Sequence, residues 1–491
     1  LPAILIGRLV RLAVRLIRPG GGSALPGLVL SKIAPGLLAA TLSKFKDGLV
    51  VVTGSAGKST TTKMLVAIAR AHGKVVFTNP STANIAQGFY SSIIERSNLW
   101  GAIAGDVAIL EMDEGHAAEI TKRIRPRQVT VLNVLEDQLD RFIDPALVRN
   151  KLGEVAARAT DAVILNTDDQ NILVMNQKYQ PSSVTWFGIA SEIVASTAHG
   201  LGAAETYLSV LPRQEVSSEI TGVDGVEASA VVQGRDCSLI LPNRGLHFAL
   251  DAIAALESAR RYLGESFDLA LATKTLNELP PVFARGEIVK LNGEEVEFIL
   301  VQNPMSFQLN LDNLNTNPEQ IFLAIGRDVH DPSWLWTVDL KNLSHVDVLS
   351  GFNFAEMGLR LSYADIPVGF ATDDLQSALD KFFALPRPEH GRKTVIFSAD
   401  AMRRTRRMLG LTDPEAVERA AHLLGEAERP VIWAGGGVGL YMDNQESKLR
   451  ARLQGRSGPP RRCTDGRVLR GVHRPAAGRR TATGAARSAR H

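Results

Sequence analysis

The stretch VVTGSAGKSTTTKML, which begins at Val51, narrows the possible folds of this chain more than any other. An apolar run leads into a loop of small residues, and Lys58 opens a pattern typical of a helix. In such a loop, Gly54 and Gly57 let backbone N–H groups approach phosphate oxygens, and the helix N-terminus adds partial positive charge. The stretch therefore predicts a nucleotide phosphate site between a strand and a helix.

The other residue types of this loop predict a metal-assisted site. Lys58 can reach the β- and γ-phosphates, and Ser59 can ligate Mg²⁺, with Ser55 and Thr60 completing the loop. Glu111 ends the apolar run AILE, at the sheet edge where α/β folds bind ligands, and we predict it as the second Mg²⁺ ligand. A buried or capping carboxylate stays the alternative interpretation of Glu111.

Composition is that of a globular protein and excludes some classes. The chain has 491 residues, enough for two to four domains, and 45% of them are hydrophobic. Its two cysteines, Cys237 and Cys463, exclude a disulfide framework and a four-cysteine zinc site, so we expect a cytoplasmic protein without a zinc ribbon. From Lys448 to His491 basic residues exceed acidic ones by 12, so the rest of the chain has a net charge of −9 and no nucleic-acid partner is predicted for it.

Short apolar runs alternate with helical patterns from Gly48 onward, which predicts an α/β fold with a parallel sheet covered on both faces. We predict four segments. These are an amphipathic helical segment (1–45), a central ATP-binding domain with a β-rich insertion at about 190–240 (46–282), a smaller Rossmann-like α/β domain (283–411), and an Arg-rich tail (412–491). The tail is predicted to be disordered, or to be the product of a fused or frame-shifted reading frame.

The amphipathic segment carries an arginine every three or four residues, at Arg8, Arg11, Arg15 and Arg18. That charge is too high for a helix that spans a bilayer. We favour a helix packed on the body of the protein, and transient contact with a membrane surface stays the alternative.

Several motifs, in this order, resemble the ATP-dependent Mur ligase superfamily. They are the tight phosphate loop, TNPSTANI, LEMDE, NVLEDQLDR, LNTDD and ARGE. The resemblance implies that ATP activates a carboxylate as an acyl phosphate, which an amine then attacks. It also implies nucleotide-binding roles for Asn84, Asn166, Asp168 and Arg285.

Further motifs resemble the MurT branch of that superfamily: VQNPMSF, DPSWLWTVD, VLSGFNFAEMGLRLSYA, and Gln138 where peptide-adding ligases usually have a metal-binding His. The branch implies amidation of the D-glutamate α-carboxylate of lipid II to D-isoglutamine, in peptidoglycan biosynthesis. It implies a GatD-type glutaminase partner that supplies ammonia. It also implies that the enzyme acts at the inner face of the membrane. Asp331 would complete the partner's Cys–His pair, and an N-cap is its alternative role.

Two other functions stay open from the sequence. One is a peptide-adding Mur ligase, which would use an amino acid in place of ammonia. The other is a degenerate Mur-like protein that binds nucleotide without chemistry. The loop before Asp331 is about three residues shorter than is usual in the branch, and Asp328 is the nearest residue that could compensate.

Overall fold

The structure is a computed structural model, and it describes residues 2–17, 24–79, 85–98, 100–135, 144–197, 199–204, 210–280, 285–314 and 318–411. These residues belong to one compact unit, residues 1–416. The tail from residue 412, together with Asn84 and Gln138, lies outside the described residues.

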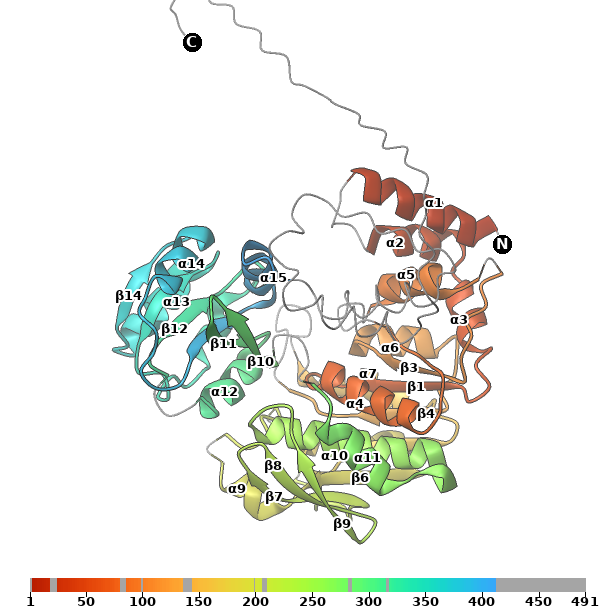
Figure 1. Ribbon diagram of the computed structural model, residues 1–491. Coiled ribbons are helices and arrows are strands. Elements are labelled where there is room, and N and C mark those ends of the chain that lie inside the picture. Colours follow the sequence, from red (N-terminus) through yellow and green to blue (C-terminus); the bar gives the residue numbers. More distant parts are fainter. Residues whose placement is uncertain are drawn as a thin grey trace, which may run out of the picture. The chain divides into compact units, whose positions relative to one another are not determined.

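The first sheet has nine strands in the order β2-β3-β1-β4-β5-β6-β7-β8-β9 (Figure 1). The strands from β2 to β7 pair in parallel, and β7, β8 and β9 pair antiparallel at one end. The last three strands lie in the segment for which a β-rich insertion is predicted. The strands are β1 (Leu49–Thr53), β2 (Val76–Phe77), β3 (Val107–Glu111), β4 (Gln128–Val131), β5 (Ala162–Asn166), β6 (Val184–Ile189), β7 (Ser218–Asp224), β8 (Glu227–Val232) and β9 (Arg235–Ile240).

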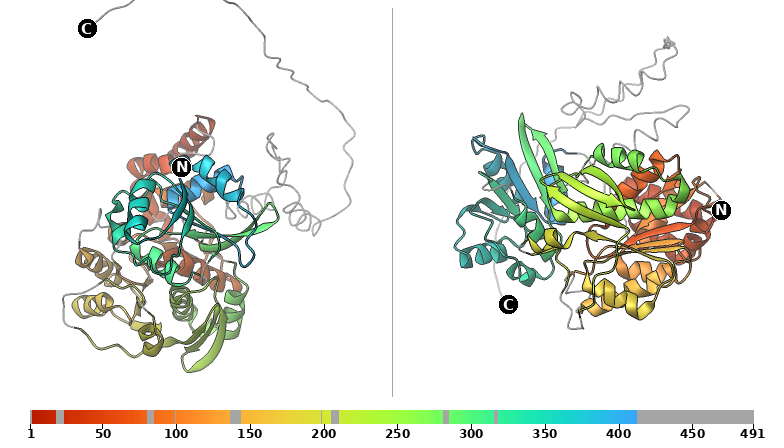
Figure 2. Two further views of the ribbon diagram at one scale, coloured as in Figure 1. Left: turned by 90° about the vertical axis from the view of Figure 1, so that its left-hand side faces the viewer. Right: turned by 90° about the horizontal axis from the view of Figure 1, so that it is seen from below.

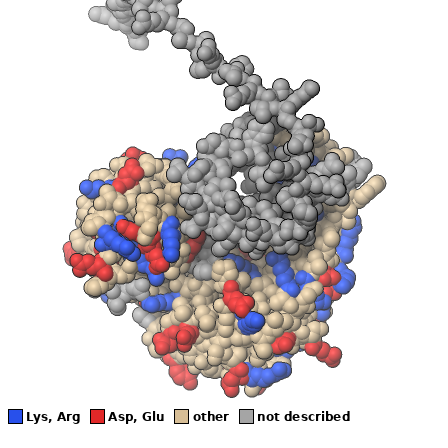
Figure 3. All heavy atoms as spheres, in the orientation of Figure 1, with Lys and Arg blue, Asp and Glu red and all other residues tan. Residues whose placement is uncertain are grey.

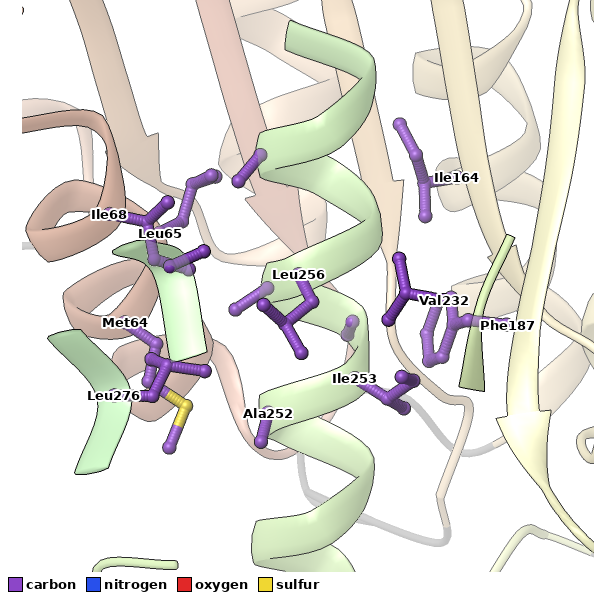
Figure 4. Packing of buried hydrophobic residues seen from close by; sticks show 14 of the residues in the cluster. Met64, Leu65, Ile68, Ile164, Phe187, Val232, Ala252, Ile253, Leu256 and Leu276 are labelled. Carbon is purple, nitrogen blue, oxygen red and sulfur yellow. The ribbon is translucent and has the colours of Figure 1, made fainter. Parts of the chain in front are cut away.

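Helices cover both faces of this sheet because alternate strand residues point to opposite sides. Val50 and Val52 of β1 lie in one core with α4, α10 and α11, whereas Leu49 and Val51 lie in the other with α1, α2 and α5 to α8. Figure 4 shows α10 in the first core, with Leu256 and Ile253 among side chains of α4, α11 and the strands. The helices are α1 (Pro2–Ile17), α2 (Ala24–Ile33), α3 (Leu37–Leu42), α4 (Lys58–Ala71), α5 (Ala86–Arg96), α6 (Glu114–Thr121), α7 (Pro145–Ala156), α8 (Gln170–Tyr179), α9 (Ser191–Ala195), α10 (Leu246–Leu263), η1 (Gly264–Ser266) and α11 (Leu269–Asn277).

The second sheet has six strands in the order β10-β11-β15-β12-β13-β14. Only β10 and β11 pair antiparallel, and Figure 2 shows them in green as a long ribbon. Buried side chains on its two faces pack against α12 and α13 on one side and α14 and α15 on the other. The elements are β10 (Arg285–Leu291), β11 (Glu294–Leu300), α12 (Pro304–Asp312), β12 (Ile321–Ala324), η2 (Pro332–Trp336), β13 (Val346–Ser350), α13 (Phe354–Tyr363), β14 (Val368–Ala371), α14 (Leu375–Phe383), β15 (Lys393–Phe397) and α15 (Ala399–Met408).

The predicted fold class, a parallel-sheet α/β domain followed by a smaller α/β domain, is confirmed. Parallel strands of a buried sheet place their carboxyl ends at one edge, so the loops after β1, β3 and β4 gather there. Those loops carry most of the residues predicted to bind nucleotide. No helix in the part of the chain that the structure describes is both long and apolar enough to cross a membrane.

Candidate functional site

The phosphate loop joins β1 to α4, and two of its positions require glycine. Gly57 has a φ of +81°, and a Cβ there would lie 2.1 Å from Oδ1 of Asp251. Gly54 has a φ of +133°, and a Cβ there would lie 3.0 Å from the backbone nitrogen of Asn133. Both positive φ values lie in a region that side-chain-bearing residues rarely adopt, so the loop shape depends on these two residues.

Asn133, which follows β4, braces the first half of the loop. Its backbone oxygen accepts a hydrogen bond from the Ser55 amide (3.1 Å), and its Oδ1 accepts one from the Ala56 amide (2.8 Å). Thr61 is bonded within α4, through its amide to the Gly57 carbonyl (2.9 Å). The sequence suggested that the whole loop faces phosphate. The Ser55 and Ala56 amides already bond Asn133, so the turn around Gly57 and the start of α4 are the parts of the loop for which a phosphate contact stays the prediction.

The Lys58 side chain folds back over the loop. Its Nζ donates to the carbonyl oxygens of Gly54 and Ser55, the second at 2.9 Å, and lies 3.3 Å from Oε1 of Glu114. The side chains of Lys58 and Glu114 are only 11% and 5% exposed. Glu114 therefore balances the charge of Lys58.

Glu111, the predicted metal ligand, ends β3 directly beside Val52 of β1. Asn79 fixes this strand end: its Oδ1 accepts from the Glu111 amide (3.0 Å) and its Nδ2 donates to the Glu111 carbonyl (3.2 Å). Glu111, Asp113 and Ser59 are all buried. Carboxylate and hydroxyl oxygens suit Mg²⁺, which is usually held by one or two carboxylates together with nucleotide phosphates. The described residues contain no cluster of three or more His, Cys, Asp or Glu side chains placed to hold a metal by themselves.

A cavity of about 420 Å³ opens at this edge of the first sheet. A volume in this range suits a small ligand. Its walls come from the phosphate loop, the end of β3, the starts of α10 and α12, and the loop that precedes η2. The described residues that line it include Ser55, Gly57, Lys58, Ser59, Thr60, Glu111, Asp113, His247, Asp251, Asn303, Ser306, Asp328 and Asp331.

Asn166 and Asp168 are not among the described residues that line this cavity. Oδ1 of Asn166 accepts from the Asp168 amide (2.9 Å), and the Asp168 carboxylate accepts from Nε of Arg213 (2.9 Å). Burial raises the pKa of Asp168, and Arg213 opposes that rise. Arg285 is described only by its backbone, at the first residue of β10, and Asn84 lies outside the described part. Nucleotide roles for these four residues stay predictions.

Asp331 caps η2, because its Oδ1 accepts from the Ser333 amide at 3.0 Å. Hydrogen bonding from the Ser333 side chain, and then from the Ser333 amide, holds the pKa of Asp331 below its usual value. Asp328 is committed elsewhere: its carboxylate accepts from the Ser398 hydroxyl (2.6 Å) and the Ala399 amide (2.8 Å) at the start of α15. Because its carboxylate is bound at the start of α15, Asp328 is poorly placed to replace Asp331, which lies directly before η2.

Sequence reasoning missed Asp251 and Asn133. Asp251 belongs to α10, which reads as a buried helix, yet its Oδ1 accepts from the Thr61 hydroxyl (3.2 Å) and lines the cavity. One signal was present in the sequence, since a lone carboxylate between Leu250 and Ala252 interrupts an apolar helix. A buried charge of this kind needs partners and often marks a site.

Two family profiles match the chain. The Mur ligase middle domain matches residues 52–233, and the MurT ligase C-terminal domain matches residues 300–399. A curated relative, the MurT subunit of the glutamine-hydrolyzing lipid II isoglutaminyl synthase of Streptococcus pneumoniae, is 24% identical over 394 residues, which cover 73% of this chain and 86% of the relative. The chain belongs to the MurT branch of the Mur ligase family. The MurT subunit of Staphylococcus aureus (strain COL) is 23% identical over 401 residues, with 74% and 88% covered.

Solved structures support the Mur ligase fold. The MurF ligase of Thermotoga maritima, solved in complex with ADP, superposes with a TM-score of 0.58 at 19% identity, over 79% of this chain and 85% of that one. At this identity the likeness establishes the fold alone. Within the MurT-type architecture, the matched C-terminal segment contains Asp331 and the aromatic residues around it.

Proposed function

We propose that this chain is the synthetase subunit of a two-subunit enzyme that amidates the D-glutamate α-carboxylate of lipid II to D-isoglutamine at the inner face of the membrane. The observation that carries the proposal is the single cavity whose described lining includes both Lys58 of the phosphate loop and Asp331 of the MurT-type segment. A site built this way can bring a nucleotide and the nitrogen source to one carboxylate. The names of the MurT relatives support the same reaction.

The residues of the loop suit Mg²⁺–ATP as the energy source. The turn at Gly57 and the start of α4 would hold the phosphates, Lys58 would balance their charge, and Ser59 and Glu111 offer oxygen ligands for the metal. The γ-phosphoryl group would pass to the substrate carboxylate, releasing ADP. Ammonia would then attack the acyl carbon and release phosphate, leaving the amide. The cavity shields the acyl phosphate from water, which would otherwise return it to the acid.

A surface beside Asp331 supports a protein partner. Trp336 and Tyr363 are 45% and 73% exposed, and their rings meet edge to face with centroids 5.3 Å apart. The guanidinium of Arg360 lies over the Trp336 ring, 5.6 Å from its centroid. Phe352, in the same domain, is 59% exposed. Exposed Trp, Tyr and Arg are the residue types that dominate the energetics of protein interfaces. We propose this surface for a GatD-type glutaminase.

The central test is reconstitution of the full chain with such a glutaminase, lipid II, glutamine and Mg²⁺–ATP, with D-isoglutamine measured by mass spectrometry. We expect Lys58→Ala to lower the rate by about 100-fold or more, the scale of losing one charge-stabilising donor. Lys63→Ala is the matched control, because Lys63 lies on the same helix and its Nζ instead bonds the Pro280 carbonyl at the surface. Unchanged amidation by Lys58→Ala would refute the proposal.

The same reconstitution separates the other functions. Incorporation of an amino acid in place of ammonia would identify a peptide-adding ligase. Binding of ATP without turnover of any acceptor would identify a nucleotide-binding protein that lacks the chemistry.

A further inference from the structure

Two arginines of helix α1, Arg8 and Arg11, point toward the protein. Nη2 of Arg8 donates to the Ser97 carbonyl (2.5 Å), and Nη2 of Arg11 pairs with Oε1 of Glu95 (2.8 Å). An amphipathic helix that covers a globular core usually does the opposite and buries its apolar stripe. The charged side of α1 is therefore the side that holds it on the body.

Close packing fixes this orientation. Ile4 is 1% exposed, and a Cβ on Gly7 would lie 2.9 Å from Cδ1 of Ile94 in α5. Helix α2 is equally tight against α5, since a Cβ on Gly27 would lie 1.9 Å from the Gln87 carbonyl oxygen. The α1–α2 pair consequently has one defined outer side, and Figure 1 shows both helices stacked outside α5.

That outer side is apolar. Leu5, Leu9 and Leu12 follow a spacing of four and three residues, which places them in one row on the helix. Leu9 and Leu12 are 64% and 57% exposed. Helix α2, which packs against α1, also has exposed apolar residues. The exposed large apolar residues of the two helices, which we call the leucine face, are Leu5, Ile6, Leu9, Leu12, Leu25, Leu28 and Ile33. Exposed apolar side chains gathered on two packed helices are typical of an interaction site.

The charge around the leucine face indicates which kind of surface binds there. The first 46 residues contain seven Lys or Arg and no Asp or Glu, and of these Arg11 and Lys46 pair with Glu95 and Asp106 of the body. Elsewhere, on the side drawn in Figure 3, basic and acidic side chains are interspersed. A second copy of this basic segment would be repelled. An anionic bilayer surface, in contrast, attracts basic segments and accepts leucines below the headgroups.

We propose that the leucine face of α1 and α2 lies on an anionic phospholipid surface, with the helices parallel to the membrane plane. Lys32 of α2 and Lys44, which follows α3, are exposed and suit lipid phosphates. This inference rests on the proposed function in one respect: a lipid-linked acceptor is the reason for the enzyme to bind a membrane. Docking would hold the enzyme where that acceptor resides, and it requires no spanning helix.

The test is a site-specific insertion measurement on the full chain. Cys237→Ser and Cys463→Ser remove the native thiols, and Leu12→Cys carries an environment-sensitive nitrobenzoxadiazole label. With vesicles of phosphatidylglycerol and phosphatidylcholine, we expect a blue shift and a several-fold rise in emission. Leu147→Cys is the matched control, because Leu147 is also half-exposed (50%) but lies on α7, away from the leucine face. Its label should stay water-like.

A second substitution makes the result specific. Adding Leu9→Glu to the chain labelled at residue 12 should weaken the vesicle-dependent signal at least tenfold, and vesicles of phosphatidylcholine alone should give little signal. Since Leu9 contributes an exposed side chain, circular dichroism and thermal unfolding should be unchanged.

Several results would overturn the proposal. One is vesicle binding without a shift at residue 12, because the Arg-rich segment after Lys448 would then be the contact. Others are a shift that follows protein concentration without lipid, which would assign the face to a second copy, or a shift that needs only the glutaminase. No step requires ATP, so failed amidation with normal insertion would refute the proposed function alone.

Discussion

Replacing Gly57 by alanine tests the geometry on which nucleotide binding depends. A non-glycine residue in the left-handed region costs about 1–2 kcal/mol. The new Cβ would also lie 2.1 Å from Oδ1 of Asp251 and 3.0 Å from its Cγ, so the carboxylate must move and give up the bond from the Thr61 hydroxyl. A hydrogen bond to a charged group contributes about 1.5–3 kcal/mol, which brings the total to about 2.5–5 kcal/mol.

This free-energy cost of Gly57→Ala can lower either the stability of the folded protein or its affinity for ATP. If the loop keeps its shape, the protein loses unfolding free energy, and if the loop relaxes, ATP binds more weakly. In the second case the affinity falls by about two to three and a half orders of magnitude, because about 1.4 kcal/mol corresponds to tenfold. Titration with a fluorescent ATP analogue in Mg²⁺, together with urea unfolding, measures both parts, and their sum should reach the stated range.

Two further variants separate the causes of that loss. Gly73→Ala is the matched control: it has a φ of +79° at the end of the same helix, with nothing within 4 Å of a new Cβ. It should lose about 1–2 kcal/mol of stability and no ATP affinity. Asp251→Ala combined with Gly57→Ala should cost less than the two single variants added, by about 1.5–3 kcal/mol, because the displaced carboxylate is counted once. Normal ATP binding and stability in Gly57→Ala, or strict additivity, would refute this reasoning.

Three other predictions concern single carboxylates. Asp331→Asn should abolish glutamine-dependent amidation and retain ammonia-dependent amidation, measured in the reconstituted pair; equal loss of both would assign Asp331 to the synthetase half. Glu114→Gln should raise ATP affinity a few-fold in a binding titration, because Lys58 no longer has a charged competitor for the phosphates, and weaker binding would place Glu114 in the nucleotide site itself. Burial raises the pKa of Asp169 from 3.8 to about 6, so the stability it contributes is full below pH 3.8 and is lost as the pH rises through 6. Asp169→Asn should therefore gain stability relative to the unchanged protein between pH 4 and pH 7 in urea unfolding, whereas a constant difference across that range would contradict the raised pKa.

The sequence predicted those parts of the site that local pattern determines. The apolar run before Gly54 and the helical period after Lys58 are properties of neighbouring residues, and the structure has β1 and α4 there. Glu111 was placed correctly at a strand end because apolar strand length is also local. Such features follow from periodicity and from the residue types that loops require.

Contacts between distant segments could not be predicted in this way. Asp251 meets Thr61 across 190 residues, and no periodicity of α10 indicates which loop its carboxylate will face. Likewise, the helical wheel of α1 identified an apolar and a basic stripe, and simple burial rules would turn the apolar stripe inward. The partners that reverse it, Glu95 and the Ser97 carbonyl, lie near the end of α5. Orientation was decided by those partners and not by the helix itself.

The two interpretations of Asp331 that the sequence left open are compatible. As an N-cap, the carboxylate accepts from the Ser333 amide, and hydrogen bonding from the Ser333 side chain and amide lowers its pKa, which favours the ionised form. An ionised, oriented carboxylate is also what a partner's imidazole needs, since it holds the tautomer and stabilises the charged form of the ring. The cap therefore prepares the group for the catalytic role instead of competing with it. Asparagine at this position keeps a capping oxygen but removes the charge, which is why Asp331→Asn separates the structural role from the electrostatic one.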